Sequence, residues 1–135
     1  MNVPKHLSHK PIIAVNDYDK IDALYANRTD ARALSIGQAQ YDDDEISLKV
    51  FRIVGGKWSR QSEELPIHRN LDLSILFLAS LMTDIDSNYS QSSLREEIIE
   101  TSRVSEINDY YKLHERKLKP RLIELKKILD KFLTL

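Results

Sequence analysis

Residues 46–58 read ISLKVFRIVGGKW, and this stretch decides the fold class of the first half of the chain. Apolar and polar side chains alternate over residues 46–50. Alternation with a period of two is typical of a β-strand, because successive side chains point to opposite faces. The two glycines that follow tolerate the positive φ angles of a two-residue hairpin turn. We therefore expect a strand over 46–54 and a returning strand over 57–62.

Two further strands complete the predicted antiparallel sheet. The stretch 33–41 reads ALSIGQAQY and places small side chains at alternate positions. Such a row suits a strand that another element covers closely. The four consecutive acids at 42–45 are expected to form a hairpin loop, because they lack the alternating ligands and central glycine of a calcium-binding loop. An apolar run at 11–15 adds a strand at an edge or in the middle of the sheet, and one or two helical turns are expected within 17–32.

The second half of the chain changes to a helical period. Pro66 suits the first turn of a helix, and the two glutamates before it favour the positive end of that helix. Its most apolar part, 73–83, has 11 residues, whereas a membrane-spanning helix needs about 20. We expect this helix to be the most buried element. Further helices are expected over 93–103, from a capping box at its start, and over 105–118, with Pro120 either kinking the latter or starting another helix.

Together these patterns predict an α+β fold in a single domain, 1–135. A small antiparallel β-meander in 1–65 is expected to pack against three or four helices in 66–135. The length of 135 residues suits one hydrophobic core.

Composition excludes several classes of site. The chain has no cysteine, which rules out disulfides, thiolate zinc sites, iron–sulfur clusters and a cysteine nucleophile, and which agrees with a reducing cytoplasm. Its three glycines form no phosphate-binding loop, and no serine lies in a nucleophile elbow. The net charge of −1 removes the simplest case for nucleic-acid binding. We predict no cofactor and no metal site.

One polar stretch offers a candidate binding site, formed by Arg60, Glu64, His68, Arg69 and Asp72. If a helix begins near Glu64, then Glu64, His68 and Asp72 share one of its faces. A carboxylate could then orient the histidine as a general base, and the two arginines could hold an anion such as phosphate. The competing interpretation is an ordinary helix start with contacts three or four residues apart, and this is the more common situation.

The same stretch carries a resemblance. WSRQSEELPIHRNLDL, preceded by the strand-like segments IGQAQ and KVFRI, resembles a family of small bacterial proteins known only as a domain of unknown function. The resemblance covers most of residues 4–85. It implies a bacterial, cytoplasmic, single-domain protein, and it implies no activity, cofactor or catalytic residue.

Two histidines near the N-terminus, His6 and His9, have the spacing of a metal-binding pair. Zinc would need two further ligands, so adventitious metal binding or simple exposure of the two side chains is the expectation.

Charge is distributed unevenly along the second half. Residues 84–109 carry seven acids and two bases, whereas residues 112–131 carry eight bases and three acids. The basic stretch could contact phosphates, but the equal and opposite sums favour pairing of the two stretches within the chain or across a dimer. Apolar residues alternate by four and three positions through the basic stretch and just beyond it. This apolar seam consists of Leu118, Leu122, Leu125, Leu129 and Phe132.

The sequence therefore favours a non-catalytic binding or interaction module with a protein partner, most simply a second copy in a homodimer, and no membrane. A small-anion-binding protein or enzyme using residues 60–72 is the first alternative. A nucleic-acid accessory protein using the basic C-terminal helix is the second.

Overall fold

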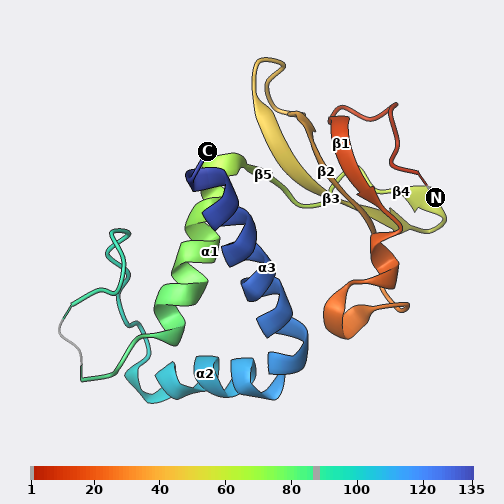
Figure 1. Ribbon diagram of the computed structural model, residues 1–135. Helices are drawn as coiled ribbons and strands as arrows, with labels where there is room; N and C mark the ends of the chain where they lie inside the picture. Colours follow the sequence, from red (N-terminus) through yellow and green to blue (C-terminus); the bar gives the residue numbers. More distant parts are fainter. Residues whose placement is uncertain (1, 87–88) are drawn as a thin grey trace. The chain divides into compact units, whose positions relative to one another are not determined.

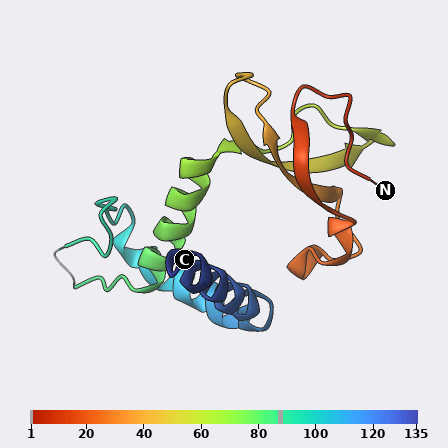
Figure 2. The same cartoon turned by 45° about the horizontal axis from the view of Figure 1, so that its top comes forward.

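A computed structural model describes residues 2–86 and 89–135 and gives an α+β protein, as predicted (Figures 1 and 2). The chain divides into two compact units, Met1–Ser74 and Ile75–Leu135, with the boundary inside the first α-helix. The strands are β1 (Lys10–Asn16), β2 (Ala31–Gln38), β3 (Ile46–Val54), β4 (Lys57–Trp58) and β5 (Glu64–Pro66). The helices are α1 (Ile67–Leu81), α2 (Val104–Leu113) and α3 (Glu115–Leu133), with short 3₁₀ turns η1 (Tyr18–Lys20), η2 (Ala23–Tyr25) and η3 (Thr101–Arg103).

The sheet is a curled antiparallel meander in the order β1-β2-β3-β4, with β5 also paired to β3. The predicted strand at 11–15 is confirmed as the edge strand β1, and β3 has the predicted bounds. The returning strand is shorter than expected, since β4 ends at Trp58. After β4 the chain moves away from β3 and then pairs with it again as β5, whose Leu65 lies opposite Leu48. One edge of the long strand β3 is thus shared between two short strands.

The turn between β3 and β4 is the predicted glycine hairpin. Gly55 and Gly56 have φ angles of 60° and 78°. These left-handed angles are those of a two-residue turn whose twist matches the flanking strands.

The inner face of the sheet holds the core of the first unit. Buried residues alternate along β2, and the small side chains predicted to lie under a covering element are the buried ones. At Gly37 a Cβ atom would lie 2.0 Å from the carbonyl oxygen of Lys10, so only glycine fits beneath the start of β1. Leu7 from the N-terminal segment packs here with Ala33 and Phe51.

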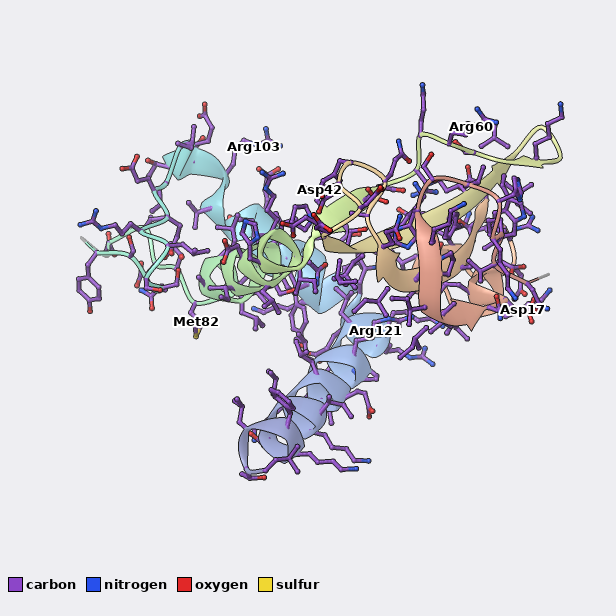
Figure 3. The ribbon with its side chains drawn as sticks, turned by 90° about the horizontal axis from the view of Figure 1, so that it is seen from above. Asp17, Asp42, Arg60, Met82, Arg103 and Arg121 are labelled. Carbon is purple, nitrogen blue, oxygen red and sulfur yellow. The ribbon has the colours of Figure 1, made fainter. Side chains whose placement is uncertain are left out.

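Helix α1 begins at Ile67, directly after Pro66, close to the predicted start. The expectation that it is the most buried element is wrong. Ala79 is its one buried residue, although all fifteen positions are described. Figure 3 shows Met82, just beyond the helix end, pointing away from the chain. The apolar residues around this helix are therefore left largely uncovered.

The helix expected over 93–103 does not form. Arg95 has a φ of 62°, a left-handed angle that interrupts a right-handed helix. The Glu96 carboxylate, expected to cap that helix, instead accepts hydrogen bonds from Ser92 Oγ at 2.5 Å and from the Gln91 backbone N–H. Only the short turn η3 is helical in this stretch.

The last two helices meet at His114, not at Pro120. The backbone N–H of His114 still bonds to the carbonyls of Tyr110 and Tyr111, which closes α2. Pro120 lies inside α3, in its second turn. The proline therefore neither ends nor starts a helix, which corrects the predicted boundary near residue 118. Across the described residues, each helix is too short or too polar to cross a membrane.

Candidate functional site

The five predicted site residues lie on three different segments. Arg60 is exposed between β4 and β5, and Glu64 is half-buried on β5. His68, Arg69 and Asp72 are exposed on α1. The proposed helix start near Glu64 is wrong, because Glu64 belongs to a strand and cannot share a helical face with the other two. His68 and Asp72 remain one turn apart, and a joint binding site of all five stays a prediction.

Glu64 takes part in a buried polar cluster on the inner face of the sheet. His9 is fully buried there, with its Nδ1 atom 3.0 Å from Ser47 Oγ and 3.0 Å from Glu64 Oε1. Its Nε2 atom is 2.9 Å from Ser35 Oγ. The other carboxylate oxygen, Glu64 Oε2, accepts a hydrogen bond from the Gln40 backbone N–H at 3.1 Å. The cluster thus ties the N-terminal segment to β2, β3 and β5.

Burial controls the charge of this cluster. Desolvation lowers the pKa of His9, against the opposing effect of the Glu64 carboxylate. Desolvation also lowers the pKa of Lys49, a buried neighbour whose ammonium lies 5.3 Å from the centre of the Phe51 ring. His9 is therefore held as a neutral imidazole at neutral pH.

Ser35, His9 and Glu64 follow the order of nucleophile, base and carboxylate in a hydrolytic triad. Their surroundings argue against that chemistry. Ser35 is 5% exposed and His9 is 0% exposed, so a substrate carbonyl has no route to the hydroxyl. The cluster is better explained as a structural set of buried polar groups, in which the two hydroxyls lie within hydrogen-bond distance of the imidazole and Glu64 Oε1 faces it without a well-aligned hydrogen bond. It also corrects the expected exposure of both N-terminal histidines, since His6 is exposed and His9 is not.

Arg52, at the end of β3, joins two other segments of the first unit. Its Nη1 donates to Asp30 Oδ1 at 2.5 Å, and its Nε and Nη2 donate to the two carboxylate oxygens of Glu63. The Arg52 hydrogen bonds hold the pKa of Glu63 below its ordinary value. One guanidinium therefore serves two carboxylates.

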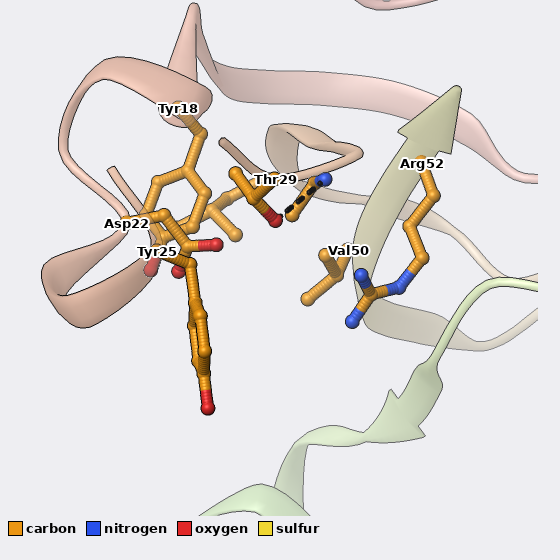
Figure 4. A pocket seen from close by; sticks show the side chains of 8 residues that line it. Tyr18, Asp22, Tyr25, Thr29, Val50 and Arg52 are labelled. Atoms are coloured by element: carbon orange, nitrogen blue, oxygen red, sulfur yellow. Dashed lines mark hydrogen bonds between the residues drawn. The ribbon is translucent and has the colours of Figure 1, made fainter. Parts of the chain in front are cut away.

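A cavity of about 370 Å³ lies beside Arg52, on the outer face of β2 and β3 (Figure 4). The connection between β1 and β2, which contains η1 and η2, forms its other wall. No motif in the sequence marked these residues, since they come from a polar stretch and from two strands. The cavity is lined by Tyr18, Asp22, Tyr25, Thr29, Ala31, Leu34, Val50 and Arg52.

Comparison with known proteins identifies a family for this chain. The model of the Family of unknown function (DUF6530) matches residues 1–98. The chain belongs to this family. The matched part contains the whole sheet, the buried cluster, the cavity and α1, whereas α2 and α3 lie beyond it. No curated protein matches the chain, and no solved structure matches it.

The segment beyond the DUF6530 match presents a surface of a different kind. Residues 99–135 are all described by the structure, and none of them is buried. The apolar seam of α3 is half-buried at its start and becomes more open toward its end, where Leu129 is 44% exposed and Phe132 is 67% exposed. Figure 3 shows the side chains of this helix projecting around its circumference. Within the described residues, the apolar face of this amphipathic helix is therefore only partly covered.

Metal binding has no candidate in the described part of this DUF6530 protein. Among the residues placed by the structure, no three histidine, aspartate or glutamate side chains come together as metal ligands.

Proposed function

We propose that this DUF6530 protein is a non-catalytic interaction module that pairs with a second copy of itself through α3. The observation that carries the proposal is the exposed apolar seam on a helix of 19 residues. A leucine or phenylalanine side chain gains about 1.5–3 kcal/mol when it passes from full exposure to full burial. Covering the exposed part of the seam therefore supplies a driving force that the helical unit does not obtain by itself.

Charge favours a second copy as the partner. Residues 84–109 carry an excess of five negative charges, and residues 112–131 carry an excess of five positive charges. The ion pairs found among the described residues of the helical unit, Arg103–Glu106 and Lys126–Asp130, each join residues three or four positions apart. The two stretches are thus able to attract their opposites on another chain. A two-fold axis would satisfy both copies equally, because a symmetric interface uses the same surface twice.

We extend the proposal to a bacterial, cytoplasmic setting, which the cysteine-free sequence and the resemblance described above support. The two alternatives, anion chemistry around residues 60–72 and nucleic-acid binding by the basic helix, stay predictions.

Sedimentation equilibrium of the full chain and two variants tests the proposal. Leu129→Glu places a charge in the apolar seam and is expected to weaken self-association at least tenfold, since an unpaired charge is costly to bury. Val54→Glu is the matched control, because Val54 is an exposed apolar residue of the first unit. It should leave association unchanged. Equal association of the wild type and Leu129→Glu would overturn the assignment of the interface to α3.

A further inference from the structure

The cavity beside Arg52 has the composition of a site for an organic cation. Figure 4 shows Tyr18, Asp22 and Tyr25 gathered along one wall, opposite Val50 and Arg52. Apolar side chains from β2 and β3 form the rest of the lining, together with the hydroxyl of Thr29. Its volume of about 370 Å³ lies in the lower part of the range of roughly 300–1,000 Å³ that small-molecule sites occupy.

The acidic group at this wall is available to a ligand. Within the described residues, the Asp22 carboxylate has neither a hydrogen bond nor an ion pair, while its backbone carbonyl accepts the Tyr25 N–H at 2.8 Å. Asp22 as a residue is half-buried and lies at the cavity wall. A negative charge that is partly withdrawn from water attracts a cation more strongly than one on an open surface.

Arg52, the cationic residue among those that line the cavity, does not make the cavity favourable for an anion. Arg52 already donates to Asp30 and to both oxygens of Glu63, so its one positive charge faces two negative charges. An anion entering the cavity would have to displace one of these carboxylates and would also face Asp22. The local charge therefore selects against anions.

Aromatic rings at the same wall add a second attraction for a cation, because the face of a tyrosine ring carries negative electrostatic potential. Arg28, which is not one of the lining residues, already makes a cation–π contact with Tyr25. The guanidinium carbon of Arg28 lies 5.8 Å from the centre of the Tyr25 ring, and the guanidinium is held by hydrogen bonds to the Leu24 carbonyl.

We propose that this cavity binds an ammonium or guanidinium group carried on a short apolar stem. Asp22 would pair with the charge, the tyrosines would contact it, and Leu34 and Val50 would contact the stem. The group could belong to a free small amine or to a lysine or arginine side chain of a protein. All lining residues lie in the unit Met1–Ser74 and inside the family match, so the site does not depend on pairing through α3.

Backbone-amide NMR titration of the full chain tests this proposal with defined probes. The probes are n-butylammonium and n-butylguanidinium, with butyrate and n-butanol as the anionic and neutral counterparts. Saturable shifts at the amides of Tyr25, Thr29 and Val50 are expected for the two cations only. Tighter binding of N-acetyl-lysine N-methylamide than of n-butylammonium would indicate a protein side chain as the source, and the reverse order would indicate a free amine. No saturable shift with either cation, or equal shifts with butyrate, would overturn the proposal.

Variants locate the site. Asp22→Asn is expected to weaken n-butylammonium binding at least tenfold, and Tyr25→Leu is expected to weaken it severalfold. Asp44→Asn removes an exposed acid from the loop before β3. Tyr41→Leu removes a tyrosine that is 53% exposed, close to the 54% of Tyr25. Both controls should bind like the wild type. Unchanged binding in a folded Asp22→Asn protein would contradict the assignment.

Discussion

His9 is a fully buried ionisable residue of the first unit. Its two ring nitrogens reach hydroxyls on β2 and β3 and a carboxylate on β5. Buried polar groups that lie this close together help to fix the arrangement of the strands around them. Because protonating the buried His9 costs free energy, the stability of the fold depends on pH.

We predict that stability falls as the pH drops below about 6.5, the pKa of histidine in an unfolded chain. Burial lowers the pKa of His9 in the folded state, so between the two pKa values the unfolded chain binds more protons. The contribution is complete above the unfolded pKa and is lost as the pH falls toward the folded one, at no more than about 1.4 kcal/mol per pH unit. Urea unfolding at several pH values measures this slope.

His9→Gln should flatten that slope, because glutamine does not titrate. His68→Gln, at an exposed position on α1, should keep the wild-type slope. The same pH dependence in His9→Gln and the wild type would show that another group causes it.

Gly37 gives a second prediction for a single residue. In Gly37→Ala the new methyl group meets the Lys10 backbone carbonyl, which cannot move without shifting β1. We expect a loss of about 1–3 kcal/mol in the free energy of unfolding, the usual cost of overpacking. Gly55→Asn is the control, because that turn position has open space and asparagine tolerates its positive φ. A Gly37→Ala protein as stable as the wild type would contradict the close approach of the two strands.

Local signals predicted several elements from the sequence. Alternation and the glycine pair were enough for β3 and its turn, and helical spacing after Pro66 was enough for α1. The small side chains of β2 also indicated the close cover that Gly37 receives.

Other elements depend on contacts between distant parts of the chain. Strand β5 forms because its three residues pair with residues 47–49 of β3. No short sequence pattern encodes this pairing. The left-handed Arg95 and the uncovered α1 likewise had no local signal.

In the candidate sites too, local sequence signals predicted one part, and contacts between distant parts of the chain determine the rest. The sequence singled out Glu64, but its partner His9 lies on the N-terminal segment and was expected to be exposed. The cavity joins a polar connection to the outer face of two strands, so its residues share no spacing along the chain.

The apolar seam of α3 allows a prediction for a whole element. The chain has no cysteine, so one introduced cysteine can form a disulfide only between two copies. In a paired state, single substitutions along the seam, such as Leu125→Cys and Leu129→Cys, should include at least one that cross-links quickly under mild oxidation. Non-reducing electrophoresis measures the rate.

Lys127→Cys is the control, because residue 127 lies outside the seam and is exposed on the same helix. Cross-linking of Lys127→Cys as fast as the fastest seam variant would contradict packing along the seam.

For the whole molecule, we propose a different task for each of the two units. The first unit lies within the family match and contains the buried cluster and the cavity. The second has exposed apolar helices and complementary charges, which favour association. Salt should weaken the attraction between the charged stretches and leave the apolar contact, so pairing should decrease but persist at high ionic strength.

The molar mass of the unmodified chain, measured by sedimentation equilibrium over a wide range of concentrations, tests whether two copies pair through α3. One chain has a mass of 15.7 kDa. Pairing through α3 predicts a mass that rises with concentration and levels off at twice this value. A mass of 15.7 kDa at every concentration would contradict the account.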